Sequence, residues 1–116
     1  MKPPAQSKFD LDTSSFGRAI TSARRHVGMS QKELAGRILK EDGLPITPQY
    51  LNDIEHDRRS PSSALIVKQL ASVFDINPDV LYWLAGRVPD DIQKPGLSSK
   101  QIENAFVAFR REIKVK

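Results

Sequence analysis

The chain has 116 residues with a hydrophobic share of 39%, which suffices for one domain with a modest core but not for a large buried pocket. It contains no cysteine, no apolar run near the roughly 18 residues that span a bilayer and no apolar stretch after Met1, so disulfides, a membrane span and a signal peptide are not expected. The 18 Lys and Arg exceed the 14 Asp and Glu by a formal charge of +4, which mildly favours a polyanionic partner and fits a cytoplasmic protein.

Residues 1–12 are predicted to form a flexible N-terminal arm, because they combine two prolines with scattered charge. After Ser14 the apolar residues recur every three or four positions, which indicates a helix. These residues are Phe16, Ile20, Ala23 and Val27. Gly28 follows where a helix C-terminal cap is expected, so the first helix should end there.

A second and a third helix are indicated by their start signals. Ser30 and Glu33 have the spacing of a capping box. The segment Glu41–Pro45 contains Gly and Pro and interrupts the pattern, and Thr47 before Pro48 then marks a new N-cap and first turn. We expect the third helix to end around Asp57. The inward positions of the two helices are predicted to be Leu34, Ala35, Ile38, Leu51 and Ile54.

Two further short helices are predicted before residue 88. The first starts near Pro61–Ser63 and carries apolar residues at helical spacing. The second opens at Asn77-Pro78, a cap followed by proline, and stops at Gly86. Phe74 and Trp83 lie at apolar helical positions and are expected in the core. The fold class is therefore all-α: a five-helix domain over residues 13–88.

The C-terminal part is predicted to be a linker over 89–97 and an additional helix over 98–116, whose start is marked by Ser98 and Gln101 in capping-box spacing. One face of this helix carries a single apolar stripe, formed by Ile102, Phe106, Phe109 and Ile113. The stripe either packs back on the five-helix core or pairs two copies of the chain. We favour dimerisation.

The second and third helices have the properties of a helix-turn-helix. In that motif one helix crosses the DNA backbone and the next enters the major groove. The groove is about 12 Å wide and accepts one helix, whose outward side chains meet the base edges. Ser30–Ile38 supplies a first helix with a polar start, and Thr47–Asp57 supplies a second that is apolar inside and polar outside.

The chain resembles the Cro/lambda-repressor-like helix-turn-helix family over roughly residues 14–88. Five stretches carry the resemblance: Met-Ser-Gln-Lys-Glu-Leu-Ala at 29–35, Ile-Thr-Pro-Gln-Tyr-Leu-Asn-Asp-Ile-Glu at 46–55, Pro61, Leu70–Ile76 and Asn77–Gly86. Because the matches are spread over five helices, the resemblance is specific, whereas a match to either half of this range alone would be a weak signal. The resemblance implies a regulator that binds double-stranded DNA, usually as a homodimer on half-sites about one helical turn apart.

The resemblance also implies roles for individual positions. Base-reading positions are Pro48, Gln49, Asn52 and Asp53, of which Gln49 and Asn52 can bond adenine through their amides. Phosphate contacts are expected from Gln31, Lys32, Thr47, Tyr50, His56, Arg58 and Arg59. For Tyr50, packing within the protein is an equal alternative to a phosphate contact. For Arg58 and Arg59, the equal alternative is a solvated turn without a phosphate contact. Arg24 and Glu55 match a pair that forms an internal salt bridge in the family.

Two features depart from the family pattern. The turn through 39–45 is about six residues longer than usual. Asp53 stands at a base-reading position with Asp57 nearby, while Pro48 has no polar side chain. An aspartate accepts from a cytosine amino group but also repels phosphate, so base assignment stays open.

No enzymatic function is expected, because the sequence has no nucleophile-elbow motif and no phosphate-binding glycine loop. No cofactor is implied. His26 and His56 have no partners at metal-ligand spacing, so no metal site is expected. Two alternatives to a repressor remain open: an antitoxin whose C-terminal segment covers a toxin, and a protein-interaction module of this fold that has lost DNA binding.

Overall fold

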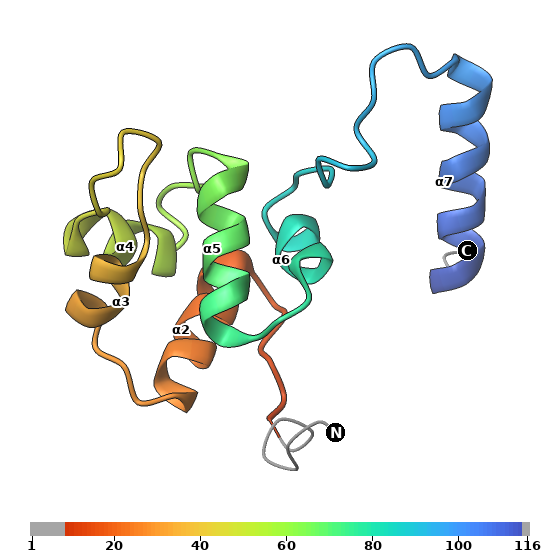
Figure 1. The fold of residues 1–116 in the computed structure, drawn as a ribbon. Coiled ribbons are helices and arrows are strands. Elements are labelled where there is room, and N and C mark those ends of the chain that lie inside the picture. The colour runs from red at the N-terminus through yellow and green to blue at the C-terminus, as the bar shows by residue number, and fades with distance from the viewer. Residues whose placement is uncertain (1–8, 115–116) are drawn as a thin grey trace.

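The computed structural model describes residues 9–114 and is all-α over that range, as the sequence predicts (Figure 1). Its helices, in chain order, are α2 (Phe16–His26), α3 (Gln31–Arg37), α4 (Pro48–Glu55), α5 (Ala64–Phe74), α6 (Pro78–Leu84) and α7 (Ser99–Ile113). Of the predicted N-terminal arm, residues 1–8 lie outside the described residues, and residues 9–12 have no regular secondary structure.

The helix starts follow local capping chemistry. Ser30 and Ser98 each form a complete capping box, with Glu33 and Gln101 respectively. Thr47 accepts a hydrogen bond from the N–H of Tyr50, and Pro48 occupies the first turn of α4. The start signals that the sequence predicts for α3, α4 and α7 are therefore confirmed. The C-terminal end of α4 lies at Glu55, two residues before the expected end.

Helices α2 to α6 enclose one hydrophobic core. Every one of them contributes fully buried side chains, among them Ile20, Leu34, Leu51, Ile54, Leu70 and Leu81. The inward positions predicted for α3 and α4 are all in this set of buried residues. Burial of large aliphatic side chains contributes about 1.5–3 kcal/mol each, so this core holds the orientation of α3 and α4.

Trp83 is not a core residue, which corrects the sequence expectation. Its side chain is 64% exposed, whereas the neighbouring Tyr82 is 2% exposed and belongs to the core. The cause is the composition of α6, where residues 80–84 are all apolar or aromatic, so that hydrophobicity does not distinguish the inward face. Phe74, the other expected core residue, is half-buried and packs against the core.

The long turn between α3 and α4 is a small hairpin that projects from the core. Its base is closed by a hydrogen bond of 2.9 Å from the Ile46 N–H to the Ile38 carbonyl, and both side chains are buried. Beyond this base Leu39 and Pro45 form an antiparallel bridge. The extra residues therefore leave and return at adjacent points, and α4 still packs on the core through Leu51 and Ile54.

Helix α7 stands away from the five-helix core, at the end of an exposed connecting segment (Figure 1). None of its residues is buried. The ring of Phe109 nevertheless lies 5.3 Å from the ring of Trp83 on α6, measured between centroids. Within residues 9–114 no helix combines the length and the apolar character needed to cross a membrane.

Candidate nucleic-acid interface

Helix α4 presents a polar flank outward because its other flank is fixed in the core. Leu51 and Ile54 are completely buried, and residues three or four apart on a helix share one face. The predicted base-reading residues lie on the opposite side: Pro48 and Gln49 are exposed, and Asn52 and Asp53 are half-buried. All four are thus brought together on one helix.

An ion pair between Arg24 of α2 and Glu55 of α4 fixes the C-terminal end of α4. The Arg24 Nε donates to Glu55 Oε2 at 2.6 Å, and Nη2 donates to Oε1 at 3.0 Å. The guanidinium also donates to the Met29 carbonyl at 2.9 Å, and hydrogen bonding to Glu55 raises the pKa of Arg24. Because the two side chains are only 12% and 2% exposed, the bidentate pair is shielded from water and geometrically specific.

Gln31 connects the start of α3 to α4 instead of extending into solvent. Its Nε2 donates to Asn52 Oδ1 at 3.1 Å and to Glu55 Oε1 at 2.9 Å. Glu55 therefore accepts hydrogen bonds from both α2 and α3. The bond from Gln31 also orients the Asn52 amide at the edge of the polar flank. The sequence suggested a phosphate contact for Gln31 and contained no sign of this inward network, because its members are 21 and 24 residues apart.

The carboxylate of Asp53 is paired within the chain. Its Oδ1 accepts from Gln49 Nε2 at 3.0 Å and from Arg58 Nε at 3.2 Å. Arg58 therefore offsets the negative charge that sequence reasoning regarded as a possible source of phosphate repulsion. The same contact orients the exposed guanidinium of Arg58 along the outward flank of α4.

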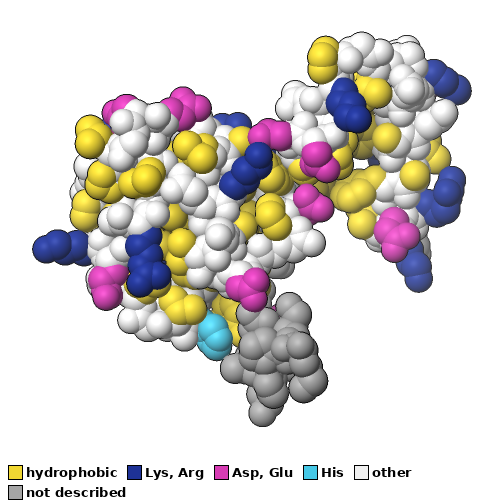
Figure 2. All heavy atoms as spheres, in the orientation of Figure 1, with side chains coloured by type: hydrophobic (Ala, Val, Ile, Leu, Met, Phe, Trp, Pro, Cys, Tyr) yellow, Lys and Arg dark blue, Asp and Glu magenta, His cyan; other side chains and the backbone are white. Residues whose placement is uncertain are grey.

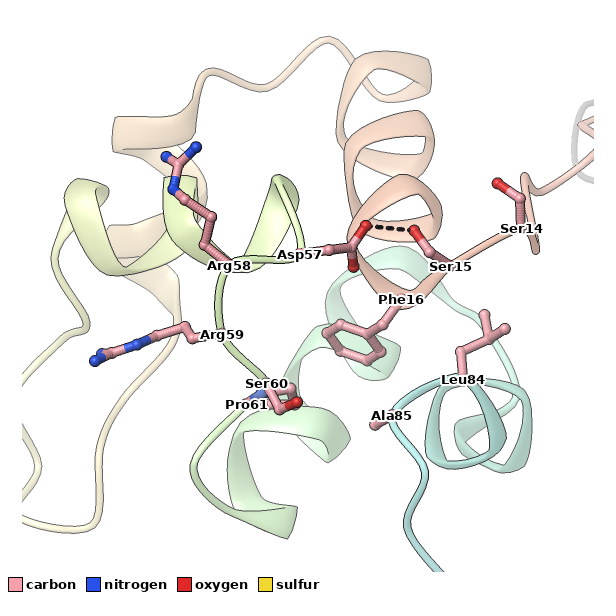
Figure 3. Close-up of a pocket in the computed structure, with 10 residues that line it drawn as sticks. All are labelled: Ser14, Ser15, Phe16, Asp57, Arg58, Arg59, Ser60, Pro61, Leu84 and Ala85. Atoms are coloured by element: carbon pink, nitrogen blue, oxygen red, sulfur yellow. Dashed lines mark hydrogen bonds between the residues drawn. The ribbon is translucent and has the colours of Figure 1, made fainter.

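Asp57 points away from the polar flank and toward the start of α2 (Figure 3). Its carboxylate accepts from the Ser15 hydroxyl at 2.6 Å and from the Gly17 N–H at 2.8 Å. A carboxylate at a helix N-terminus satisfies free N–H groups and opposes the positive end of the helix dipole. Asp57 is thus a capping residue for a helix 40 residues earlier, a role that no local sequence signal indicates.

The segment after α4 is held against it by Tyr50. The Tyr50 hydroxyl accepts from the Ser62 N–H at 2.8 Å, and the Arg59 guanidinium lies 4.9 Å from the centre of the Tyr50 ring. Arg58 and Arg59 extend outward from the open hollow that this segment lines together with the start of α2 (Figure 3). Their guanidinium groups are therefore available to a ligand along α4 and not inside the hollow.

The remaining predicted phosphate contacts lie at the edges of the same region. Lys32 is exposed on the first turn of α3. Thr47 uses its hydroxyl oxygen to cap α4, accepting from the Tyr50 N–H at 3.0 Å. His56 follows α4, with Nδ1 at 2.9 Å from the Asn52 carbonyl oxygen. These three residues are exposed, as are Arg58 and Arg59, and the five are together named the polar rim of α4.

Comparison with known proteins identifies the helix-turn-helix family, whose match spans residues 20–81, just over half of the chain. No curated protein and no solved structure gave a match. The matched range runs from within α2 to within α6 and includes both helices of the motif. The chain therefore belongs to the Cro/lambda-repressor-like helix-turn-helix family, a membership that supports a role as a DNA-binding transcriptional regulator.

Proposed function

We propose that the chain is a repressor that binds an inverted-repeat operator as a homodimer, with α4 in the major groove. The observation that carries this proposal is the fixed presentation of α4. Its inner flank is anchored by Leu51 and Ile54, and its C-terminal end is held by the Arg24–Glu55 pair. A rigid helix with an exposed polar flank loses little conformational entropy when it enters the groove.

The proposed base contacts are made by Gln49 and Asn52, with Asp53 and Pro48 beside them. An Asn or Gln amide recognises adenine through its N6 and N7 positions in the major groove. The exposed Gln49 amide bonds to the half-buried Asp53, which is also paired with Arg58, so Gln49 can exchange this contact for a base without leaving the carboxylate unpaired. Asp53 can in turn accept from a cytosine amino group while remaining close to Arg58.

Phosphate contacts are proposed for the polar rim of α4 and for Gln31 and Tyr50. Arg58, Arg59 and Lys32 provide charge, and each phosphate that is neutralised releases counterions. Thr47, Tyr50 and His56 supply polar groups whose positions are already fixed by contacts within the chain. Gln31 donates both of its amide hydrogens to Asn52 and Glu55, so it contacts a phosphate only when it exchanges one of these bonds. Such contacts set the register of the protein on the duplex, and the base contacts then specify sequence.

Repression is proposed to be steric: a dimer that occupies a promoter-proximal operator blocks the polymerase. Two copies of α4 would read half-sites about one helical turn apart. The surface proposed to join the copies is the apolar stripe of α7, formed by Ile102, Phe106, Phe109 and Ile113, all of which are exposed.

The proposal is tested by selecting bound sequences from a random DNA pool with the full chain. The expected result is an inverted repeat whose affinity falls steeply with salt. Gln49→Ala should cost about 1–3 kcal/mol and relax specificity at one base pair, whereas Gln93→Ala, an exposed glutamine in the linker, should change neither. If Gln49→Ala and Asn52→Ala bind every DNA variant as the wild type does, α4 is not the reading helix.

The exposed stripe of α7 also favours a second candidate function, an antitoxin whose C-terminal helix covers a toxin. This function is compatible with DNA binding. A small toxin-like reading frame beside the gene, whose product forms a complex that requires α7, would support it. An absence of any salt-dependent DNA binding would instead favour the third reading, a protein-interaction module.

A further inference from the structure

The apolar face of α7 has no covering element in the described chain. Ile102, Phe106, Phe109 and Ile113 are between 40% and 51% exposed, and no residue of α7 is buried. Hydrophobic side chains gather on the side of α7 that faces α6 (Figure 2), where Trp83 contacts Phe109 yet stays 64% exposed. Because an isolated helix of 15 residues is only marginally stable in water, α7 gains stability when this stripe is covered.

We propose that the stripe is covered by α7 of a second copy, and that the two helices run antiparallel. The residues of the stripe follow one another at spacings of four, three and four, which is the pattern of a coiled-coil seam. In an antiparallel pair centred between Phe106 and Phe109, each Phe106 faces the partner's Phe109. Each Ile102 then faces the partner's Ile113. This pairing deepens the proposed function, since it specifies how the dimer is built.

Charge complementarity selects this direction over a parallel one. Glu103 and Arg110 lie seven residues apart, two turns along the same flank of the stripe. The guanidinium of Arg110 lies 5.9 Å from the centre of the Phe106 ring, which places it along the seam. In the antiparallel pair Glu103 of each copy faces Arg110 of the other, so two opposite-charge pairs form symmetrically.

The other flank and the helix ends agree with the same direction. The opposite flank carries Ala105 and Glu112. In the antiparallel pair Ala105 of each copy faces Glu112 of the other, so no like charges are brought together on this flank. A parallel pair would instead place Arg110 opposite Ala105. It would also bring together the basic C-terminal ends, which carry Arg111 and Lys114. Antiparallel helix dipoles attract, whereas parallel ones repel.

The first test measures dimerisation of the full chain by sedimentation equilibrium without DNA. Glu103→Arg and Arg110→Glu each replace two attractive pairs by two repulsive ones, so each should weaken the dimer by about tenfold. The double variant should regain wild-type association, and an equimolar mixture of the two single variants should form heterodimers. Glu112→Arg makes the same charge change on the other flank, facing Ala105, and should leave association unchanged. A double variant as weak as either single one would overturn the pairing.

The second test determines direction with introduced cysteines, since the chain has none of its own. In the antiparallel pair residue 102 faces residue 113, and the two copies of residue 102 are about 16 Å apart, too far for a disulfide. Ile102→Cys mixed with Ile113→Cys should therefore cross-link, whereas each variant alone should not. Cross-linking of each variant by itself shows a parallel pair and overturns the proposal.

These outcomes are distinguishable from a failure of the proposed function, because neither readout contains DNA. A chain that remains monomeric at all concentrations but still binds a selected operator overturns the α7 pairing and leaves the DNA-binding role in place. A chain that pairs through α7 but shows no operator selectivity overturns the DNA-binding role and leaves the α7 pairing in place.

Discussion

The carboxylate of Glu55 lies 2.6 Å from the Nε of Arg24, so the last residue of α4 is tied directly to α2. Gln31 donates to the same carboxylate at 2.9 Å, which adds α3 to the junction. Helix α2 and the two helices of the helix-turn-helix, α3 and α4, thus meet at one buried acidic group. The orientation of α4 depends on this group as well as on apolar packing.

Replacement of Glu55 by leucine should destabilise the fold by about 3–5 kcal/mol, because it leaves the Arg24 guanidinium buried without its partner. The double change Arg24→Met with Glu55→Leu should recover most of that loss, since apolar residues of similar volume can replace a buried pair. Urea unfolding measures the free energy of unfolding of both variants. Arg25→Ala, at an exposed position beside Arg24, is the control and should shift stability by no more than about 0.5 kcal/mol.

Gly17 allows α2 to approach the end of α4, and Gly17→Ala should destabilise the fold by roughly 1–3 kcal/mol or more. A Cβ there would lie 2.5 Å from the carbonyl oxygens of Glu55 and Ile54 and 2.7 Å from Asp57 Oδ1. Two of these atoms belong to the backbone and cannot move aside easily. Thermal unfolding measures the effect.

The matched control is Gly36→Ala, because Gly36 also lies in a helix but has open space around its Cα. Alanine should stabilise the protein there by about 0.5–1 kcal/mol. Equal effects at the two glycines would contradict the close approach of α2 and α4.

Gln69 fixes the hairpin between α3 and α4, and Gln69→Ala should increase the mobility of that hairpin without unfolding the core. Its Oε1 accepts from the Leu39 N–H at 2.8 Å, and its Nε2 donates to the Leu39 carbonyl at 2.7 Å. Loss of both bonds should cost about 1–3 kcal/mol. Amide hydrogen exchange should accelerate at Leu39, Lys40 and Gly43 but not at Leu51. Unchanged exchange at Leu39 would show that Gln69 does not hold the hairpin.

The capping box of α3 should make stability depend on pH through Glu33. The backbone N–H and hydroxyl of Ser30 bond to its carboxylate and hold the pKa of Glu33 below its ordinary value of 4.5. A lowered pKa in the folded state means that the ionised form stabilises the fold above pH 4.5, and that this contribution is lost as the pH falls through the lower value.

Melting temperatures of the wild type and Glu33→Gln, compared from about pH 7 to about pH 3, test this dependence. The wild type should be the more stable at neutral pH, and the difference should shrink on acidification. In a Ser30→Ala background the pH-dependent difference should shrink but persist, because the backbone N–H of residue 30, the larger cause of the lowered pKa of Glu33, is retained. A difference that grows toward low pH would contradict the lowered pKa.

The sequence by itself determined the helices and most of their boundaries. Ser30, Thr47 and Ser98 cap their helices through bonds to residues three positions later, so the signal and the structure lie within one turn. The inward residues Leu51 and Ile54 follow from the period of the same helix. The candidate reading residues Gln49 and Asn52 were predicted from the family resemblance, and in the structure they lie away from the side of α4 that carries Leu51 and Ile54.

Only the tertiary structure decided how those helices are joined. It placed Asp57 on the N–H of Gly17, bonded Gln31 to Glu55 across 24 residues, and turned Trp83 outward while burying Tyr82. These relationships depend on which faces meet after the chain has folded. A capping serine acts on its own turn, but a carboxylate that caps a helix 40 residues away is specified by packing, and packing has no local period in the sequence.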